Sequence, residues 1–251
     1  MITLHFIGIG MGNPDHLTVE AIGALNNADV ILLPRKGPDK TDLADLRRQI
    51  CDLVLKNPVE IVEFDLPIRD SKTSSYLDGV QDWHSAIATT WQRIILRSLP
   101  EGGRAALMIW GDPALYDSSL RIADRLLSQG MPVQIEMVPG LTSFQILTAA
   151  NRIPLNTLGS AVTITTGRNL RDHGWPADCE TLVVMLDGGC AFQDLDPTGY
   201  DIWWGAYLGM SNQILISGKL EECGELIITE RAVARQNHGW IMDTYLLRRR
   251  L

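Results

Sequence analysis

The chain has 251 residues, 45% of them apolar and 21% charged, and it carries a formal net charge of −8 at pH 7. This length suits one large domain or two small ones, and the composition is typical of a folded globular protein rather than a disordered one. An acidic chain of this kind is a poor candidate for a nucleic-acid binder, because neutralising phosphates requires a positive field.

Targeting and metal-binding signals are missing from the sequence. The longest apolar run, residues 105–110, is far shorter than the ~18 residues of a membrane span. The N-terminus has no basic segment before its first apolar stretch, which is unlike a secretory signal peptide. The four cysteines and five histidines are scattered without metal-ligand spacing. We therefore expect a cytoplasmic protein with no metal and no membrane partner.

The first 150 residues alternate between strand-like and helix-like patterns. Strands are predicted over residues 4–8, 30–33, 59–64, 105–110 and 133–138. Amphipathic helices are predicted over residues 18–28, 41–56, 80–99, 118–129 and 141–151, with Thr18 as the N-cap of the first. Such alternation predicts βαβ units and a mainly parallel sheet with flanking helices on both faces.

The pattern changes after residue 153. Strand-like runs then follow one another closely, at residues 161–166, 181–186, 202–208, 213–217, 226–229 and 240–247. Few helical signals separate them, which favours a mixed, largely antiparallel sheet. We place a domain boundary at Pro154, so that residues 1–153 form an N-terminal α/β domain and residues 154–251 a C-terminal α/β domain.

The loop after the first predicted strand contains three alternate glycines, Gly8, Gly10 and Gly12. Ligands of open α/β sheets bind where loops leave the carboxyl ends of strands. A dinucleotide-binding loop would need a third glycine where Asn13 stands, and an acidic residue after the second strand, where the chain has Arg35. A nicotinamide-dependent oxidoreductase is thus a disfavoured alternative. The glycines still allow close approach to some ligand, or simply form a tight turn.

A second unusual loop, residues 110–118, follows the fourth predicted strand. Asp112 precedes Pro113 and is therefore kept out of the α region, which fixes its carboxylate at the strand end. A carboxylate there suits hydrogen bonds to an amine or to ribose hydroxyls. The alternative is a simple turn in which Asp117 or Ser118 caps the next helix.

The third loop, residues 138–144, follows the fifth predicted strand. Its Thr142 and Ser143 could cap a helix or hold a ligand. Each loop alone is a weak signal. Three such loops at successive strand ends of one sheet together favour a ligand-binding site.

The three loops, in this order and spacing, resemble the tetrapyrrole methylases, which use S-adenosylmethionine to methylate precorrins, uroporphyrinogen and, in one branch, diphthine. The resemblance is carried by residues 8–18, 28–30, 111–113, 138–143, 153–155 and 217–220. It implies two α/β domains, the first with a mainly parallel sheet and the second with a mixed sheet, a cofactor cleft between them, and a homodimer. Many members have proline where this chain has Met11, so inference at that position is limited to the backbone.

Other segments resemble one branch of this family in particular. They are residues 12–18, 109–113, 115–122, 142–145, 164–168 and 202–207. That branch belongs to aerobic cobalamin biosynthesis, methylates C-1 of precorrin-5 and releases the extruded two-carbon unit as acetate, giving precorrin-6A. The alternative within the family is a methyltransferase for a different precorrin, for uroporphyrinogen or for diphthine.

The resemblance also implies a set of cofactor-binding residues. For S-adenosylmethionine, and for the product S-adenosylhomocysteine, these are Gly10, Met11, Trp110, Gly111, Asp112, Leu115, Thr142, Ser143, Met185, Leu186, Ala206 and Gly209. Methyl transfer from a sulfonium is an in-line displacement that consumes charge, so alignment and exclusion of water should supply most of the rate. A site lined largely by backbone fits that demand.

A tetrapyrrole substrate carries several carboxylates, which an acidic protein must hold with local positive charge. Arg35, Lys36 and Lys40 follow the second predicted strand, and Arg168 and Arg171 follow the first strand of the second domain. Guanidinium groups pair bidentately with carboxylates, which favours the arginines. The alternative for each residue is a solvated surface charge.

Release of acetate needs an activated water or an internal carboxylate, with a general base near the substrate. Asp112, Tyr116 and Asp117 are the candidate catalytic residues, and His173 has suitable chemistry as well. Neither a G-x-S-x-G elbow nor a Ser/His/Asp order is present. The sequence does not choose among these candidates.

Overall fold

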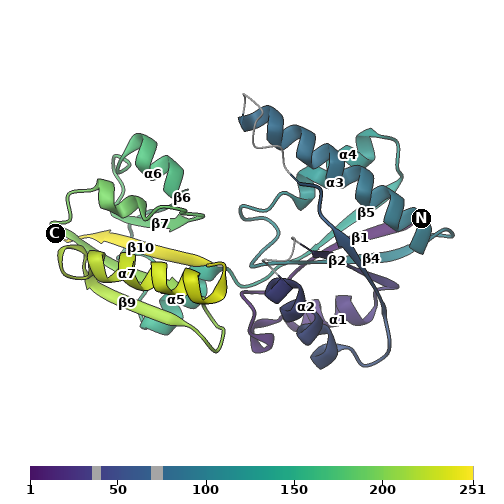
Figure 1. Ribbon diagram of the computed structural model, residues 1–251, viewed down its shortest axis with the longest axis horizontal. Coiled ribbons are helices and arrows are strands. Elements are labelled where there is room, and N and C mark those ends of the chain that lie inside the picture. The colour runs from purple at the N-terminus through teal and green to yellow at the C-terminus, as the bar shows by residue number, and fades with distance from the viewer. Residues whose placement is uncertain (36–40, 69–75, 251) are drawn as a thin grey trace. The chain divides into compact units, whose positions relative to one another are not determined.

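The computed structural model describes residues 1–35, 41–68 and 76–250. The chain divides into two compact units, an N-terminal unit, Met1–Leu141, and a C-terminal unit, Thr142–Leu251. Each unit has its own five-stranded sheet (Figure 1). Within the described ranges, none of the helices combines the length and the apolar character needed to cross a membrane.

The N-terminal unit is built on a fully parallel sheet in the order β3-β2-β4-β1-β5. Its strands are β1 (Ile2–Gly8), β2 (Val30–Arg35), β3 (Glu60–Asp65), β4 (Gly103–Ile109) and β5 (Val133–Val138). Its helices are the 3-10 helix η1 (Pro14–His16), α1 (Val19–Asn26), α2 (Thr41–Val54), α3 (Tyr76–Ser98) and α4 (Ser119–Ser128). The predicted parallel α/β architecture is confirmed.

Helices cover both faces of this sheet. Figure 1 shows α3 and α4 on one face, where Phe6 of β1 packs among their apolar side chains. On the opposite face Ile7 packs with α1 and α2. Because successive strand residues point to opposite faces and both faces are buried, the strands read as continuous apolar runs. The predicted N-cap is also confirmed, since the Thr18 hydroxyl accepts from the Ala21 N–H at 3.0 Å.

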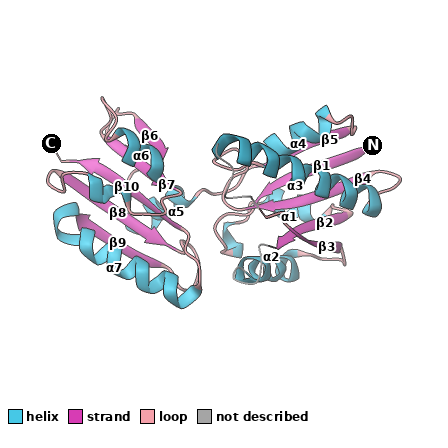
Figure 2. Cartoon of the chain, turned by 45° about the horizontal axis from the view of Figure 1, so that its top comes forward, coloured by secondary structure: helices cyan, strands magenta, loops and turns pink. Residues whose placement is uncertain are grey.

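The C-terminal unit has a mixed sheet in the order β6-β7-β10-β8-β9 (Figure 2). Its strands are β6 (Val162–Thr166), β7 (Thr181–Met185), β8 (Tyr200–Ala206), β9 (Ile214–Lys219) and β10 (Asp243–Arg249). Its helices are α5 (Ser143–Asn151), α6 (Gly167–His173), the 3-10 helix η3 (Ala191–Asp194) and α7 (Leu220–His238). Only β6 and β7 pair in parallel among the described strands of this sheet, which confirms the largely antiparallel prediction.

One predicted strand is wrong. Residues 226–229 lie inside α7, whose buried face consists of Leu220, Cys223, Ile227, Arg231 and Ala234. A short apolar run cannot by itself distinguish a strand from a helix. The helical period was hidden because one of its core positions is occupied by an arginine.

The division between the units falls after Leu141, earlier than the boundary placed at Pro154. The difference is α5, which follows β5 as the helix of a βα unit would, but packs on the sheet of the C-terminal unit. The Thr244 hydroxyl of β10 donates to the Ser143 Oγ at 2.8 Å. Leu147 lies against Gly205 of β8, where a Cβ would meet it at 2.8 Å. Contacts distant in sequence thus decide where this helix belongs.

A buried histidine should make the stability of the N-terminal unit depend on pH. His84 of α3 is 4% exposed, and its Nε2 has no hydrogen-bond partner among the described residues. Burial, with Arg125 nearby, lowers the pKa of His84. Since the unfolded chain has the ordinary histidine pKa of about 6.5, it takes up the proton first as pH falls below that value, so folding stability declines.

We expect the H84F variant to lose less unfolding free energy than the parent between about pH 7.5 and pH 5.5. Urea unfolding at both pH values measures the difference. Other titrating groups contribute equally to both proteins and cancel. An identical pH slope in parent and variant would contradict the prediction.

Candidate functional site

Two of the glycine-bearing loops are joined at the carboxyl edge of the N-terminal sheet. They follow β1 and β4, which are neighbours in the sheet. The Gly111 N–H donates to the Gly10 carbonyl at 2.7 Å, and the Gly10 N–H to the Gly111 carbonyl at 3.4 Å. Gly10 has φ +66° and Gly111 φ +67°, a region that favours glycine. The structure therefore brings Gly10 and Met11 next to Trp110 and Gly111.

The third loop packs against the first two without room for a side chain. A Cβ on Gly140 would lie 2.2 Å from the Gly111 carbonyl oxygen, and one on Gly8 would lie 2.6 Å from the Gly140 nitrogen. Neither Gly8 nor Gly140 has a positive φ, so these two positions require glycine for space. The three loops thus form one packed backbone surface.

The Asp112 carboxylate ties these loops together. Its Oδ1 accepts from the Ala114 N–H at 2.8 Å, and its Oδ2 accepts from the Gly140 N–H at 3.0 Å. Leu115 closes the same turn, because its N–H donates to the Asp112 carbonyl at 3.2 Å. Asp112 is therefore fixed at the strand end, and both of its carboxylate oxygens accept hydrogen bonds from loop backbone. A part for it in catalysis stays a prediction.

We expect the D112N variant to lose about 1–3 kcal/mol of stability, because an amide cannot accept both backbone N–H groups. Urea unfolding measures this loss, and unchanged stability would contradict the structural role. Turnover assays test the catalytic role separately. A D112N protein that completes both methyl transfer and acetate release would remove Asp112 from the catalytic candidates.

The other two candidate catalytic residues lie in the same loop. Asp117 lies just before Ser118, the N-cap of α4, and its Oδ1 accepts from the Ser119 N–H at 2.7 Å. Tyr116 has φ +52° and is 42% exposed. Partial burial raises the pKa of the Tyr116 phenol, so at neutral pH it is protonated and can donate a hydrogen bond. A catalytic role for Tyr116 stays a prediction.

Arg47 is a residue of this region that the sequence analysis missed. It belongs to α2, is 8% exposed, and donates from Nε to the Met108 carbonyl at 3.1 Å. Its Cζ lies 4.7 Å from the centre of the Trp110 ring, a cation–π contact. Burial lowers the pKa of Arg47 to about 10, so the guanidinium stays charged at neutral pH. An arginine on the apolar face of a predicted helix was the available signal.

Thr142 and Ser143 begin α5 and use their polar groups inside the C-terminal unit. The Thr142 N–H donates to the Gln145 Oε1 at 2.9 Å, and the Thr142 hydroxyl donates to the same oxygen at 2.8 Å. The Ser143 hydroxyl is buried and accepts from Thr244. Helix capping, one of the two predicted roles, is what these contacts show. Cofactor binding at both positions stays a prediction.

The remaining predicted cofactor residues share one edge of the C-terminal sheet. Met185 ends β7 and Leu186 follows it, while Ala206 ends β8 opposite Asp243 of β10. Leu186 has φ +52° and a side chain that is 66% exposed. Gly209 lies in the loop after β8 and donates from its N–H to a side-chain amide at 2.7 Å. The sheet topology therefore groups these four residues at one edge.

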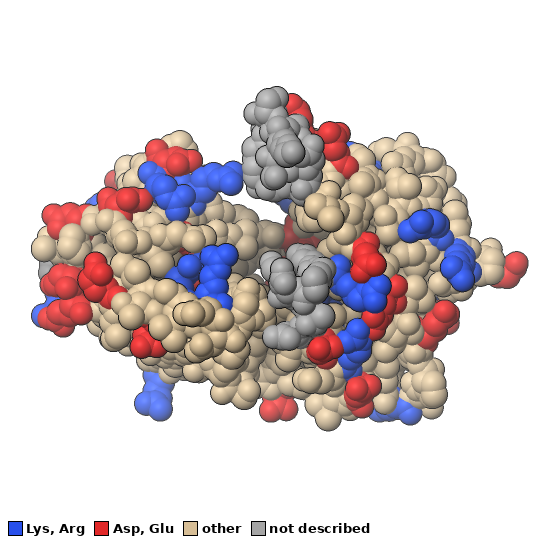
Figure 3. Space-filling view, viewed as in Figure 1, with Lys and Arg blue, Asp and Glu red and all other residues tan. Residues whose placement is uncertain are grey.

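The candidate substrate-binding cations are paired with carboxylates or exposed. Arg35 lies 3.1 Å from Asp65 at the end of β3, and Arg171 lies 3.5 Å from Asp187. Arg168 is exposed on α6. Lys36 and Lys40 lie outside the described residues. On the face drawn in Figure 3, acidic and basic side chains are interspersed, with no single broad basic field.

The four cysteines are free and buried, and burial raises the pKa of two of them, Cys51 and Cys190, to about 11. Cys51 and Cys190 are therefore thiols at neutral pH and weak nucleophiles. Across the described ranges, no three His, Cys, Asp or Glu side chains are grouped as a metal site needs.

A known enzyme family has this architecture: a parallel sheet with packed loops at its carboxyl edge, followed by a mixed-sheet unit. Residues 3–224 match the Tetrapyrrole (Corrin/Porphyrin) Methylases, and the chain belongs to this methyltransferase family. It is 47% identical over 245 residues to the precorrin-6A synthase [deacetylating] of Sinorhizobium sp., an alignment that covers 97% of this chain and 94% of that protein.

Solved structures show the same fold. A cobalamin synthesis related protein (CobF) from Corynebacterium diphtheriae superposes with a TM-score of 0.84 and 37% identity, covering 99% of both chains. The uroporphyrin-III C-methyl transferase of Thermus thermophilus, complexed with S-adenyl homocysteine, has a TM-score of 0.61 and 20% identity. That alignment covers 98% of this chain and 91% of the other, and at this identity it shows the fold alone.

Proposed function

We propose that the chain is an S-adenosylmethionine-dependent C-methyltransferase of aerobic cobalamin biosynthesis. In this proposal it methylates C-1 of precorrin-5 and releases acetate, giving precorrin-6A. The observation that carries the proposal is 47% identity to a deacetylating precorrin-6A synthase over nearly the full length of both proteins. The joined loops at the carboxyl edge of the N-terminal sheet support it, because ligands of such sheets bind there.

The residues present fit such a cofactor. In the N-terminal unit, Gly10, Met11, Trp110 and Gly111 would hold it with backbone groups and apolar side chains. In the C-terminal unit, we assign Met185 and Leu186 to the cofactor as well. The Trp110 Nε1–H is buried and has no hydrogen-bond partner among the described residues, so it could be satisfied by a ligand acceptor. When bound, S-adenosylmethionine supplies an electrophilic methyl group. The residues that surround it need only align the reactants and exclude water.

Substrate binding and acetate release use different groups. We assign the carboxylates of precorrin-5 to Arg35, Lys36, Arg168 and Arg171, since guanidinium and ammonium groups attract them. Water cleaves the bond to the extruded acetyl group: its oxygen joins the acetyl carbon, the bonding electron pair stays on C-1, and the acetyl leaves as acetate with both protons of the water released. Asp112, Tyr116 and Asp117 stay the candidates for handling these protons, and the Asp117 carboxylate already accepts from the Ser119 N–H.

Calorimetric titration with S-adenosylhomocysteine and, separately, with NADH tests the class of ligand. Saturable binding of S-adenosylhomocysteine alone is the expected result. Binding of NADH alone would overturn the proposal and restore the dinucleotide interpretation of the glycine loop. Incubation with precorrin-5 should then give a product heavier by one methyl and lighter by the released acetyl, together with acetate, whereas methylation of another tetrapyrrole in its place would redirect the substrate assignment.

We further propose that the protein is a cytoplasmic homodimer, as members of the family generally are. Analytical ultracentrifugation should give twice the chain mass of 27.8 kDa. A monomeric mass at micromolar concentration would contradict this part of the proposal.

A further inference from the structure

The turn after β7 places an apolar side chain in a strained and exposed position. Leu186 has φ +52° and is 66% exposed, and Cys190, four residues later, has φ +56°. Residues other than glycine rarely adopt this left-handed region, and they keep it only where the surrounding structure imposes it.

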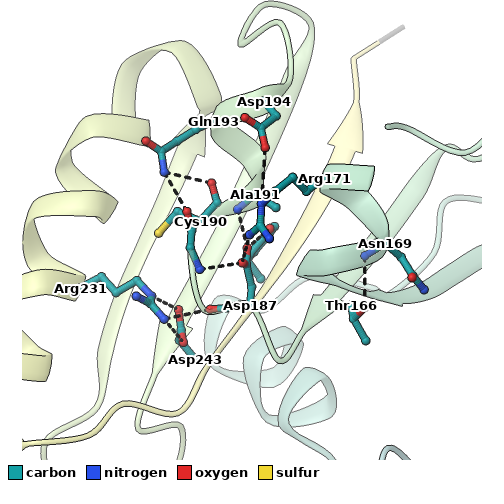
Figure 4. Close-up of polar contacts among 12 residues, drawn as sticks. Thr166, Asn169, Arg171, Asp187, Cys190, Ala191, Gln193, Asp194, Arg231 and Asp243 are labelled. Atoms are coloured by element: carbon teal, nitrogen blue, oxygen red, sulfur yellow. Dashed lines mark hydrogen bonds and ion pairs between the residues drawn. The ribbon is translucent and has the colours of Figure 1, made fainter. Parts of the chain in front are cut away.

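The Asp187 side chain holds the turn from within. It is 5% exposed, and it accepts from the Gly189 N–H at 3.0 Å and from the Ala191 N–H at 2.6 Å. The Tyr245 hydroxyl of β10 donates to the Asp187 Oδ2 at 2.7 Å. Figure 4 shows the Asp187 carboxylate beside Ala191, with Arg171 approaching from α6. One buried carboxylate thus fixes residues 187–191 against the sheet.

A buried ion pair between Arg231 and Asp243 holds the backbone of Asp187. Arg231 of α7 donates from Nη2 to the Asp187 carbonyl at 2.9 Å. Its Nε donates to the Asp243 Oδ2 at 2.8 Å, and the Trp204 indole N–H donates to the same oxygen at 3.0 Å. Figure 4 shows Arg231 and Asp243 beside Asp187. Groups from α7 and β10 therefore hold the turn after β7, and the Trp204 indole of β8 supports the Arg231–Asp243 pair.

We propose that Asp187 is a positioning residue for cofactor binding, which sets the Met185–Leu186 edge through the buried network of Tyr245, Arg231 and Asp243. The inference rests on the proposed function, in which Met185 and Leu186 contact S-adenosylmethionine. A turn held in a strained conformation before the ligand arrives loses less conformational freedom on binding. The network therefore acts on affinity for the cofactor rather than on the methyl transfer itself.

The Y245F variant removes one hydroxyl from this network and keeps the ring. We expect its dissociation constant for S-adenosylhomocysteine, measured by calorimetry, to rise about tenfold, the size of a lost hydrogen bond to a charged group. The KM for S-adenosylmethionine should rise in parallel, while kcat at saturating cofactor stays within about twofold, since uniform binding is what is lost. A fall in kcat with unchanged KM would overturn the inference.

The T181V variant is the matched control. Thr181 is fully buried at the amino end of β7, the strand that ends at Met185. Its hydroxyl accepts from Arg248 at 3.1 Å. It should lose thermal stability as Y245F does, yet bind S-adenosylhomocysteine as the parent does. Equal weakening in both variants would show a merely structural effect and overturn the inference.

The R171A variant serves if Y245F does not fold, because Arg171 is about half-exposed and contacts the Asp187 Oδ1 at 3.5 Å. Its affinity for S-adenosylhomocysteine should fall about two- to threefold, in keeping with a partly exposed contact. Unchanged affinity in every folded variant would overturn the inference while leaving the proposed function intact. A parent protein that does not bind S-adenosylhomocysteine would instead overturn the proposed function.

Discussion

The G140A variant is expected to lose S-adenosylhomocysteine binding and about 3 kcal/mol of stability in the N-terminal unit. The added methyl would lie 2.2 Å from the Gly111 carbonyl oxygen and 2.8 Å from the Gly8 carbonyl carbon. These atoms are backbone, so they cannot swing aside as a flexible side chain would. The loops must separate, which breaks the Gly140 N–H to Asp112 hydrogen bond as well. Calorimetry and urea unfolding measure the two losses.

The matched control is G23A, in α1 of the same unit. A Cβ at Gly23 has nothing within 4 Å, and the position is inside a helix. Alanine there should stabilise the unit by about 0.5–1 kcal/mol, as helix propensity predicts, and leave ligand binding unchanged. Normal S-adenosylhomocysteine affinity in G140A would refute the packed arrangement of the three loops.

The second large effect is expected from R231M in the C-terminal unit. Arg231 and Asp243 form a buried ion pair at 2.8 Å, with side chains 11% and 7% exposed. Removing the guanidinium leaves the Asp243 carboxylate buried, with the Trp204 indole still donating to it. Stranding one partner of such a pair costs about 3–5 kcal/mol, which urea unfolding followed by tryptophan fluorescence would detect.

The control for this prediction is R250M. Arg250 also pairs with a carboxylate, that of Glu221 at 2.6 Å, but those side chains are 30% and 32% exposed. Water can solvate the remaining carboxylate, so the loss should be much smaller than in R231M. Equal losses in the two variants would mean that burial of the Arg231 pair has no energetic consequence.

The elements of the N-terminal unit were predictable because their signals are local. Each strand is a continuous apolar run, since both faces of a parallel sheet are buried. Thr18 caps α1 as its sequence position indicates. The three loops were found from Gly, Asp and Pro residues that directly follow strands, and their common edge follows from the parallel topology.

The errors and omissions arise where a core position is polar or a contact is distant. Arg231 interrupts the apolar face of α7, so residues 226–229 read as a strand instead. Arg47 likewise interrupts the apolar face of α2. The sequence analysis did not identify it as a site residue, although it lies against Trp110. Helix α5 was assigned by its place after β5, whereas its packing partner, Thr244, is 101 residues away.

The sequence alone therefore determined the α/β class, the order of nearly all elements, the three loops and the family to which the chain belongs. Only the tertiary structure decided which groups pair: Asp112 with Gly140 across 28 residues, and Asp187 with Tyr245 across 58. The reason is physical. Periodicity, caps and turns depend on residues within a few positions of one another, whereas a buried carboxylate is satisfied by whichever donors the fold brings to it, and those donors leave no periodic trace in the chain.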